Sequence, residues 1–241
     1  MPPTPLHPAR FAARPNRFLV LARLAESDLL VEAHLPDPGR LRELFLPGAR
    51  MMLRPAEPGS TRRTAWTAVL VEVPGATDAP PAWVSLDTGL PNRIVGEALE
   101  AGTLDEFAGW TLVRREVPVG RSRLDFLLTD LAGRSLYLEV KSVTLVEDDG
   151  VARFPDAVTA RGARHVDELR ELVECGAGEA AVLFVLQRAD AHRIEAARSI
   201  DPVFAAALER ARDAGVRILG RRCHVGLEGV TLGERVPADV G

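Results

Sequence analysis

Lysine is almost absent from this chain of 241 residues. Of its 30 basic residues, 29 are arginine and one is lysine, Lys141. An ammonium is compact and orients a single water, whereas a guanidinium is a wide planar fork, so the two are not interchangeable. Lys141 is therefore either a chance remnant of the bias or a residue whose chemistry arginine cannot replace.

Cysteine and long apolar runs are also scarce. The two cysteines, Cys175 and Cys223, form no metal-ligand cluster, and nothing suggests secretion, so we expect them to be reduced thiols in a cytoplasm. No run of 18 or more apolar residues is present, which predicts no transmembrane helix. The segment Met1–Pro8 lacks the apolar core of a signal peptide. We therefore expect a cytoplasmic protein without membrane contact.

Charge limits the class of protein without defining it. The content of 46% hydrophobic and 27% charged residues is that of a soluble globular protein. The net charge of −4 argues against a protein that binds nucleic acid indiscriminately. Residues 1–84 carry 10 basic and 8 acidic side chains, and residues 85–241 carry 20 and 26. An acidic domain still binds DNA if metal ions neutralise its carboxylates and arginines meet the phosphates.

The first third of the chain has an all-β pattern. Residues 1–16 predict a flexible arm, and residues 17–87 predict an OB-like β-barrel domain, because five short strands with an inserted helical turn at Leu41–Leu46 are typical of that fold. A fragment of a β-sandwich is the alternative. The strands are expected over residues 17–24, 29–34, 49–54, 64–73 and 83–87.

From Thr88 onward, helices alternate with strands. Apolar spacing predicts helices over residues 92–101, 161–173 and 202–214. Strands are expected over residues 111–117, 123–129, 136–143, 180–186 and 216–219. This order predicts a mixed sheet flanked by helices in a domain of residues 88–235, followed by a tail of residues 236–241. The fold class is thus α+β with two domains.

One pair of predicted strands gathers carboxylates around Lys141. Alternation along a strand places Glu139 and Lys141 on the same face, and a hairpin through Asp130–Arg134 would bring Asp125 beside them. Two carboxylates and an ammonium suit a hard divalent cation, Mg²⁺ or Mn²⁺, with a group that orients water. A cross-strand salt bridge is the alternative, although arginine would serve that role equally well.

The spacing of these residues resembles the PD-(D/E)XK nuclease core. Asp125 is followed, after thirteen residues, by Glu139-Val140-Lys141. Leu124 stands where the motif has proline, which is not a ligand. Longer phrases resemble the sugar fermentation stimulation protein A family; they are Ser122–Leu128, Leu138–Leu145, Phe154–Gly162, Val182–Arg188, Arg17-Phe18 and His34–Gly39.

That resemblance implies an OB-like domain followed by a restriction-endonuclease-like domain in a DNA-binding protein linked to sugar metabolism. It also implies that Asp125 and Glu139 are metal ligands, with the carbonyl of Val140 as a further one, and that Lys141 positions or activates water. A helix glutamate often completes such sites. Glu97 is the candidate because a helical wheel places it at the flank of the apolar face.

Further residues are candidates for contacting nucleic acid. They are Arg40, Arg42, Arg62 and Arg63 in the barrel, and Arg123, Arg161, His165 and Gln187 in the second domain. His165 either faces the site or is a core histidine, and Gln187 either approaches the metal cluster or caps the sheet. His34 is a site residue or a structural one. Trp66 and Trp83 either stack on bases or fill the barrel core. The acidic run Glu147–Gly150 is interpreted as a hairpin turn.

The leading hypothesis is a DNA-binding protein with a Mg²⁺-dependent phosphodiesterase site; single-stranded DNA and RNA are further possible substrates. The first alternative is a binding-only regulator of sugar metabolism genes, without sequence specificity, whose nuclease-like site is vestigial. The second is an enzyme that acts on a small phosphodiester. The sequence leaves the oligomeric state open.

Overall fold

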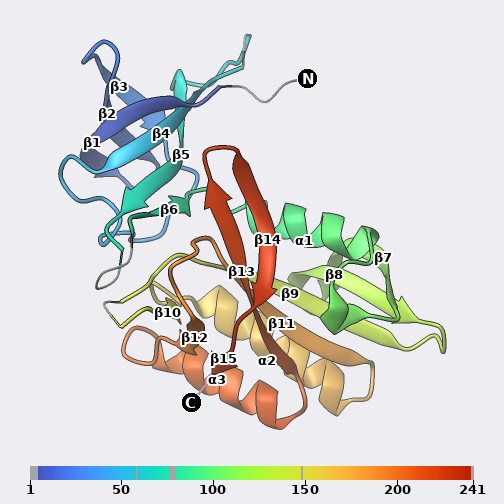
Figure 1. Ribbon diagram of the computed structural model, residues 1–241. Helices are drawn as coiled ribbons and strands as arrows, with labels where there is room; N and C mark the ends of the chain where they lie inside the picture. Colours follow the sequence, from blue (N-terminus) through green and yellow to red (C-terminus); the bar gives the residue numbers. More distant parts are fainter. Residues whose placement is uncertain (1–4, 58, 76–79, 148, 240–241) are drawn as a thin grey trace. The chain divides into compact units, whose positions relative to one another are not determined.

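The computed structural model describes residues 5–57, 59–75, 80–147 and 149–239. The chain forms two compact units (Figure 1). The first consists of the residues up to Thr88 together with Gln187–Asp190 and His224–Val230. The second consists of Gly89–Leu186, Ala191–Cys223 and the residues from Thr231 onward. Two short segments from the second half of the chain therefore belong with the first unit.

The first unit contains a closed five-stranded barrel. Its strands are β1 (His7–Asn16), β2 (Leu19–Leu24), β3 (Leu30–His34), β4 (Arg50–Pro55) and β5 (Trp66–Val73). A further strand, β6 (Ala82–Ser85), pairs antiparallel with β5. β1 pairs with both β2 and β4, and β3 closes the barrel by pairing in parallel with β5. This connectivity is that of the OB fold, so the prediction of an OB-like barrel is confirmed.

The structure corrects the expected arm over residues 1–16. His7–Asn16 is a barrel strand, and its residues Ala9 and Phe11 are buried in the barrel core. Prolines and arginines interrupt this segment and conceal its alternation. Residues 1–4 lie outside the described residues. The helical turn expected at Leu41–Leu46 is present as a single turn, closed by the amide of Phe45 on the carbonyl of Leu41.

A mixed six-stranded sheet forms the centre of the second unit. Its order is β14-β13-β11-β9-β8-β7. The strands are β7 (Trp110–Val119), β8 (Ser122–Asp130), β9 (Ser135–Val143), β11 (Glu179–Leu186), β13 (Arg217–Gly226) and β14 (Gly229–Arg235). β7, β8 and β9 are antiparallel, whereas β9, β11 and β13 are parallel. The predicted mixed sheet with flanking helices is confirmed.

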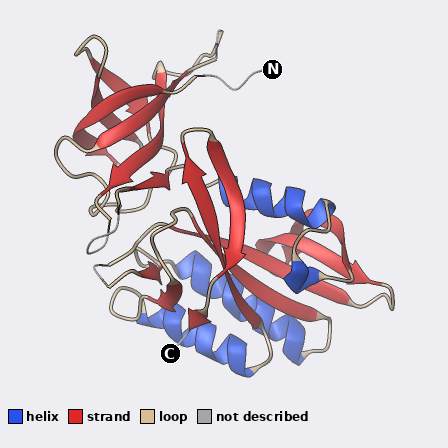
Figure 2. Cartoon of the chain, in the orientation of Figure 1, coloured by secondary structure: helices blue, strands red, loops and turns tan. Residues whose placement is uncertain are grey.

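In the described residues, three α-helices pack on this unit, and Figure 2 draws the helices in blue. α1 (Leu90–Glu100) contacts β7 and β9, while α2 (Ala160–Glu174) contacts β11 and also packs against α3 (Pro202–Asp213). Asp201 caps α3 by accepting from the amide of Phe204, and its second oxygen accepts from the amide of Thr159. One carboxylate therefore joins the starts of α2 and α3.

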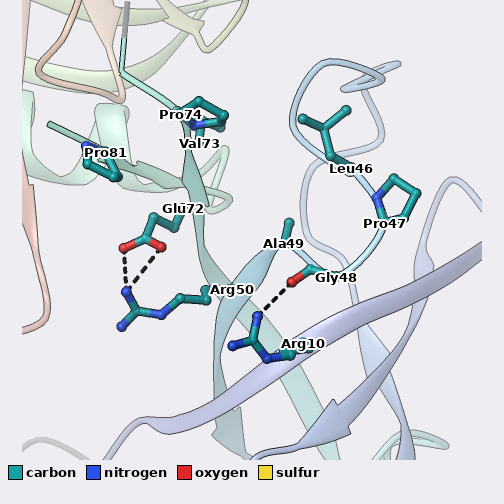
Figure 3. Close-up of a pocket in the computed structure, with 10 residues that line it drawn as sticks. All are labelled: Arg10, Leu46, Pro47, Gly48, Ala49, Arg50, Glu72, Val73, Pro74 and Pro81. Atoms are coloured by element: carbon teal, nitrogen blue, oxygen red, sulfur yellow. Dashed lines mark hydrogen bonds and ion pairs between the residues drawn. The ribbon is translucent and has the colours of Figure 1, made fainter. Parts of the chain in front are cut away.

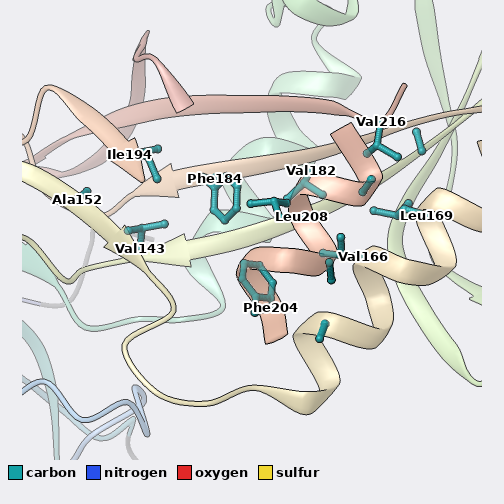
Figure 4. Packing of buried hydrophobic residues seen from close by; sticks show 14 of the residues in the cluster. Val143, Ala152, Val166, Leu169, Val182, Phe184, Ile194, Phe204, Leu208 and Val216 are labelled. Carbon is teal, nitrogen blue, oxygen red and sulfur yellow. The ribbon is translucent and has the colours of Figure 1, made fainter. Parts of the chain in front are cut away.

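The main core of the second unit lies between the sheet and the pair α2 and α3 (Figure 4). Val166 and Leu169 of α2 meet Val182 and Phe184 of β11 in this cluster. Phe204 of α3 is fully buried here. Burial of these side chains is the main source of stability, since each contributes roughly 1.5–3 kcal/mol.

A small parallel sheet was not predicted from the sequence. It consists of β10 (Val151–Phe154), β12 (Arg193–Ala196) and β15 (Ala238–Asp239). Because β15 is paired and Val236 is buried, the expected tail of residues 236–241 is wrong for residues 236–239. A 3₁₀ turn, η1 (Asp105–Phe107), also escaped prediction. No helix in the described part of the chain is long and apolar enough to cross a membrane.

Candidate functional site

Asp125 lies where the ladder between β8 and β9 opens. The two strands pair from Thr129 and Ser135 up to Phe126 and Leu138. At the next position, Oδ2 of Asp125 accepts from the backbone amide of Val140 at 2.7 Å. Its Oδ1 accepts from the side-chain amide of Asn92 on α1. Both oxygens of this carboxylate are thus held in place by hydrogen bonds.

Glu139 is buried beside it on β9, with 4% of its surface exposed. Its Oε1 accepts from Nζ of Lys141 at 2.6 Å and lies 2.6 Å from Nδ1 of His165 on α2. Its Oε2 is buried and has no hydrogen-bond partner among the described residues. Buried carboxylate oxygens are normally paired, which makes Oε2 a candidate ligand atom for a cation.

The structure therefore brings Asp125, Glu139 and Lys141 together. The side chain of Lys141 is only 11% exposed. The hairpin through Asp130–Arg134 that this arrangement requires is present, since the amide of Asp130 donates to the carbonyl of Arg134. A solvated salt bridge, the alternative interpretation, does not describe a lysine and a glutamate that are both largely buried.

His165 is part of this hydrogen-bonded chain. Nε of Arg161, which is itself exposed, donates to Nε2 of His165 at 3.3 Å. Because Nε2 accepts, the ring hydrogen belongs on Nδ1, from which it points to Glu139. Of the two alternatives for His165, the structure favours the one in which this residue faces the site.

The two carboxyl groups differ in their electrostatics. Burial, together with the negative charge of Glu139, raises the pKa of Asp125 to about 6, against the smaller effects of Val140, Lys141 and Asn92. Burial also acts to raise the pKa of Glu139, but the hydrogen bond from His165 and the charge of Lys141 outweigh it and lower that pKa. Above about pH 6 both carboxyl groups are therefore ionised, with the ammonium of Lys141 beside them.

The donor set restricts which metal fits. Among the described residues, no group of three or more His, Cys, Asp or Glu side chains is placed to hold a metal ion. Side-chain ligation would therefore come from Asp125 and Glu139, and the carbonyl of Val140 stays a predicted further ligand. Structural and catalytic zinc sites use three or four protein ligands. Mg²⁺ usually takes one or two carboxylates and completes its shell with water and phosphate oxygens, so it fits better.

Asn92 contacts the candidate site through its hydrogen bond to Asp125 and is not among the residues expected from the sequence. Glu97, the expected fourth residue, is exposed, and in the described chain it makes no side-chain hydrogen bond or ion pair. The buried face of α1 contains Val95, Gly96 and Leu99. Asn92 shares that face, whereas Glu97 lies about 140° around the helix from it. A polar side chain on an apolar face was the signal for Asn92, and the structure does not bring Glu97 to the carboxylates.

Gln187 is not available to nucleic acid. It is fully buried, and its Nε2 donates to the carbonyl of Asp87 at 2.9 Å. Its own carbonyl accepts from the amide of Ser85 at 2.9 Å. These bonds join the residues after β11 to β6 and the segment that follows it. The prediction of a nucleic-acid contact at Gln187 is therefore wrong, because the residue serves the fold.

The predicted arginines of the barrel are on the surface. Arg40, Arg42, Arg62 and Arg63 are all exposed. Nη1 of Arg62 donates to the hydroxyl of Thr67 at 3.0 Å. Arg123 of the second unit is also exposed, with a weak ion pair of 3.7 Å to Glu116.

The tryptophans of the barrel are both engaged. Trp66 packs against the barrel core and meets the ring of His7 edge-on at 5.1 Å. The ring of Trp83 lies under the guanidinium of Arg50, at 5.6 Å. For Trp66 the structure supports the core alternative, and Trp83 is covered on one face.

A separate cavity of about 420 Å³ opens on the barrel (Figure 3). Nη1 of Arg50 donates to both carboxylate oxygens of Glu72, at 2.8 and 3.1 Å, and Arg10 donates to the carbonyl of Gly48. The polar groups that line the cavity thus satisfy one another. None of the predicted site residues lines it.

Within the residues that the structure describes, the acidic run forms no ligand cluster. The amide of Gly150 donates to the carbonyl of Glu147 at 2.9 Å, and the φ angle of Gly150 is +72°. Asp149 pairs with Arg153 at 2.9 Å. Asp148 lies outside the described residues. The interpretation of this run as a turn is confirmed.

Both units match family models of known proteins. Residues 13–85 match the family model described as the SfsA N-terminal OB domain, and residues 89–229 match that of the sugar fermentation stimulation protein RE domain. The sugar fermentation stimulation protein homolog of Shouchella clausii is 46% identical over 236 residues, covering 98% of each chain. The homolog of Moorella thermoacetica is 47% identical over 223 residues, covering 92% of each.

A solved structure also matches along the whole chain. SfsA of Pyrococcus furiosus in complex with Ca²⁺ is 29% identical, with a TM-score of 0.84. The match covers 99% of this chain and 98% of that one.

Proposed function

Because this chain belongs to the sugar fermentation stimulation protein family, with an OB domain and a restriction-endonuclease-like domain, we propose that it is a nucleic-acid-binding phosphodiesterase that requires Mg²⁺ or Mn²⁺. The observation that carries the proposal is the buried Oε2 of Glu139, which has no hydrogen-bond partner in the described part of the chain and lies beside Asp125 and Lys141. The Ca²⁺ complex of the relative from Pyrococcus furiosus supports a divalent cation in this family.

Asp125 and Glu139 would hold the cation. Hydrogen bonds from Val140 and Asn92 fix the carboxylate of Asp125, and Lys141 and His165 both occupy Oε1 of Glu139. Because both donors bind Oε1, Oε2 is left for the cation, and the carboxylate of Glu139 is kept from rotating. A bound Mg²⁺ would polarise the scissile phosphate and lower the pKa of a bound water.

Lys141 would orient the attacking water and stabilise negative charge on the phosphate. An ammonium has three hydrogens, and the bond to Glu139 uses one of them. The remaining two have no acceptor among the described residues and can point to a water and to a phosphate oxygen. A fixed donor in a largely buried site needs no rearrangement as charge develops, which is the basis of its catalytic effect. The wider fork of arginine would not fit the same geometry.

The barrel would bind the nucleic-acid strand at one of its ends. OB barrels commonly bind ligands through strands 2 and 3 and through the loops between strands 1 and 2 and between strands 4 and 5. Here the first of these loops carries Phe18, which is 52% exposed, and the second carries Arg62 and Arg63.

The strand register brings these two loops together. Leu19, next to Phe18, pairs with His34, which in turn pairs with Thr67, the residue that holds Arg62. An exposed ring near an arginine is a platform for stacking a base and binding its phosphate. We therefore assign base stacking to Phe18 rather than to Trp66 or Trp83.

The test is a cleavage assay on supercoiled plasmid, single-stranded DNA and RNA, with Mg²⁺, with Mn²⁺ and with EDTA. We expect cleavage that requires metal and is abolished by Asp125→Ala. Lys141→Arg should reduce the rate by about 10²-fold or more, the usual effect of losing a positioned proton-transfer or water-orienting group. Asp213→Ala is the matched control, because Asp213 is exposed and, among the described residues, pairs only with Arg212.

The possible outcomes separate the hypotheses. Absence of metal-dependent cleavage on every polymer would refute the nuclease proposal. Tight DNA binding without cleavage would instead support the binding-only regulator. Hydrolysis of a small phosphodiester such as bis(p-nitrophenyl) phosphate, without cleavage of polymers, would point to the third hypothesis.

A further inference from the structure

Most arginines of the second unit are neutralised by carboxylates. Arg153 pairs with Asp149 and Glu147, at 2.9 and 2.8 Å. Arg193 pairs with Glu195 at 2.6 Å, and Arg198 pairs with Glu209. A guanidinium that already has such a partner must exchange it before it binds a phosphate. Paired arginines therefore contribute little to nucleic-acid binding.

Three exposed arginines near the site are different. Arg121, Arg161 and Arg164 make no ion pair with a carboxylate of the described residues. Arg123 has only the 3.7 Å contact to Glu116, and both of these side chains are more than 60% exposed. An exposed ion pair of this kind contributes little to stability, so a phosphate can replace Glu116 as the partner of Arg123 at little cost. These four positive charges are available to an anionic ligand.

Hydrogen bonds attach the two segments that carry the four arginines to each other. Arg121 and Arg123 lie at the turn of the β7–β8 hairpin, and Arg161 and Arg164 lie in the first turns of α2. Nε of Arg164 donates to the hydroxyl of Ser122 at 3.2 Å, and the amide of Arg121 donates to Glu168 at 3.2 Å. The hairpin turn is therefore attached to α2, and the two pairs of arginines form one surface, which we call the arginine surface.

The arginine surface adjoins the candidate metal ligands on both sides. Arg161 bonds His165, which bonds Glu139. Ser122 precedes Asp125 by three residues of the same strand, about 10 Å at the rise of a β-strand. A strand whose scissile phosphate lies at Asp125 and Glu139 therefore has its neighbouring phosphates within reach of these arginines.

We propose that the arginine surface, Arg121, Arg123, Arg161 and Arg164, binds the phosphates of a nucleic-acid backbone and holds the strand against the site. This inference rests on the proposed function and adds where on the second unit the substrate is held. Arginine suits the role because its fork binds phosphate oxygens in pairs. Contact with phosphates releases counterions, so affinity falls as salt rises.

The experiment measures binding of labelled single-stranded and duplex DNA by fluorescence anisotropy over a range of salt concentrations, in EDTA so that no metal-dependent cleavage occurs. The test protein is the double variant Arg121→Gln/Arg164→Gln. The control is Arg193→Gln/Arg198→Gln, which removes the same charge from two paired arginines. For each phosphate that the variant no longer binds, the slope of log K against log[salt] should shrink by about 0.9 for duplex DNA and about 0.7 for single strands. The control should keep the slope of the unmodified protein.

The outcomes distinguish this inference from the proposed function. If both double variants bind with the same slope, the arginine surface is refuted, even if the protein cleaves DNA in Mg²⁺. If the slope changes as expected but Mg²⁺ produces no cleavage, the nuclease proposal fails and the surface stands. If the unmodified protein binds no nucleic acid, both are refuted. A melting temperature for each variant shows whether weaker binding reflects unfolding.

Discussion

Asp125→Asn should stabilise the metal-free protein although it removes a proposed metal ligand. Burial and the charge of Glu139 raise the pKa of Asp125 from 3.8 to about 6. In the folded protein the ionised form is therefore disfavoured relative to the unfolded chain. Replacing the carboxyl with a neutral amide of the same shape removes this unfavourable charge.

The raised pKa of Asp125 determines how much stability Asp125→Asn should gain and over which pH range. A pKa raised by about two units corresponds to about 3 kcal/mol, at 1.36 kcal/mol per unit. Between pH 3.8 and about 6 the folded chain holds the proton more often than the unfolded chain, so the stability of the wild-type protein falls as the pH rises through this window. Above it, the difference between Asp125→Asn and wild type should be constant, and below it the difference should disappear.

The local structure can accept the amide. Oδ1 of the new asparagine can take the hydrogen bond from the backbone amide of Val140, as the carboxylate does now. Asn92 must turn its side-chain amide by a half-rotation, so that it accepts from position 125 instead of donating. The full gain of about 3 kcal/mol is thus an upper value, since a poorly made bond costs about 1 kcal/mol.

Urea unfolding in EDTA at several pH values measures this effect, with Asp213→Asn as a control for an exposed carboxyl. Added Mg²⁺ or Ca²⁺ should stabilise the wild type, by about 2.7 kcal/mol at one hundred times the dissociation constant, and should leave Asp125→Asn unchanged. If Asp125→Asn is less stable than wild type at pH 8 in EDTA, or gains as much from metal, the reasoning about this site is wrong.

Three further changes test the site, the core and the thiols. His165→Leu should weaken metal binding by about 10–100-fold, because it removes the donor that holds Glu139. His165→Asn should recover part of this affinity, because it keeps a donor near the position of Nδ1. Calorimetric titration with Mn²⁺ measures both affinities, and an equal loss of affinity in the two variants would refute a positioning role for His165. Phe204→Ala should cost about 3–5 kcal/mol in urea unfolding, and a loss below about 1 kcal/mol would contradict the packing shown in Figure 4. Burial raises the pKa of Cys223 to about 12. A thiol reagent at pH 8 should therefore label the exposed Cys175 quickly and Cys223 only after unfolding. Rapid labelling of both thiols in the folded protein would contradict the fold around Cys223.

The regular elements of this protein were predictable because their patterns are local. Helix α2, expected over residues 161–173, spans Ala160–Glu174, and strand β11, expected over residues 180–186, spans Glu179–Leu186. The apolar stripe of a helix and the continuous apolar run of a buried strand both consist of residues that are close in sequence. Strand β1 was not predictable in this way, since it owes its structure to pairing with β2 and β4 and not to its own composition.

The short strands at the end of the fold were missed for a related reason. β12 and β15 have four and two residues, too few for a pattern, and each exists because a partner strand lies beside it. The grouping of Gln187–Asp190 with the barrel unit depends likewise on contacts between segments about one hundred residues apart. No window of sequence contains that information.

At the candidate site, residue types and strand alternation were enough to predict that Asp125, Glu139 and the single lysine lie together. Chemistry restricts which side chains can serve a hard cation, and a period of two fixes which of them share a face. Only the tertiary structure decided which neighbours complete the set. Asn92 rather than Glu97 reaches Asp125, and His165 reaches Glu139, because the rotation and docking of α1 and α2 are set by packing across the whole unit.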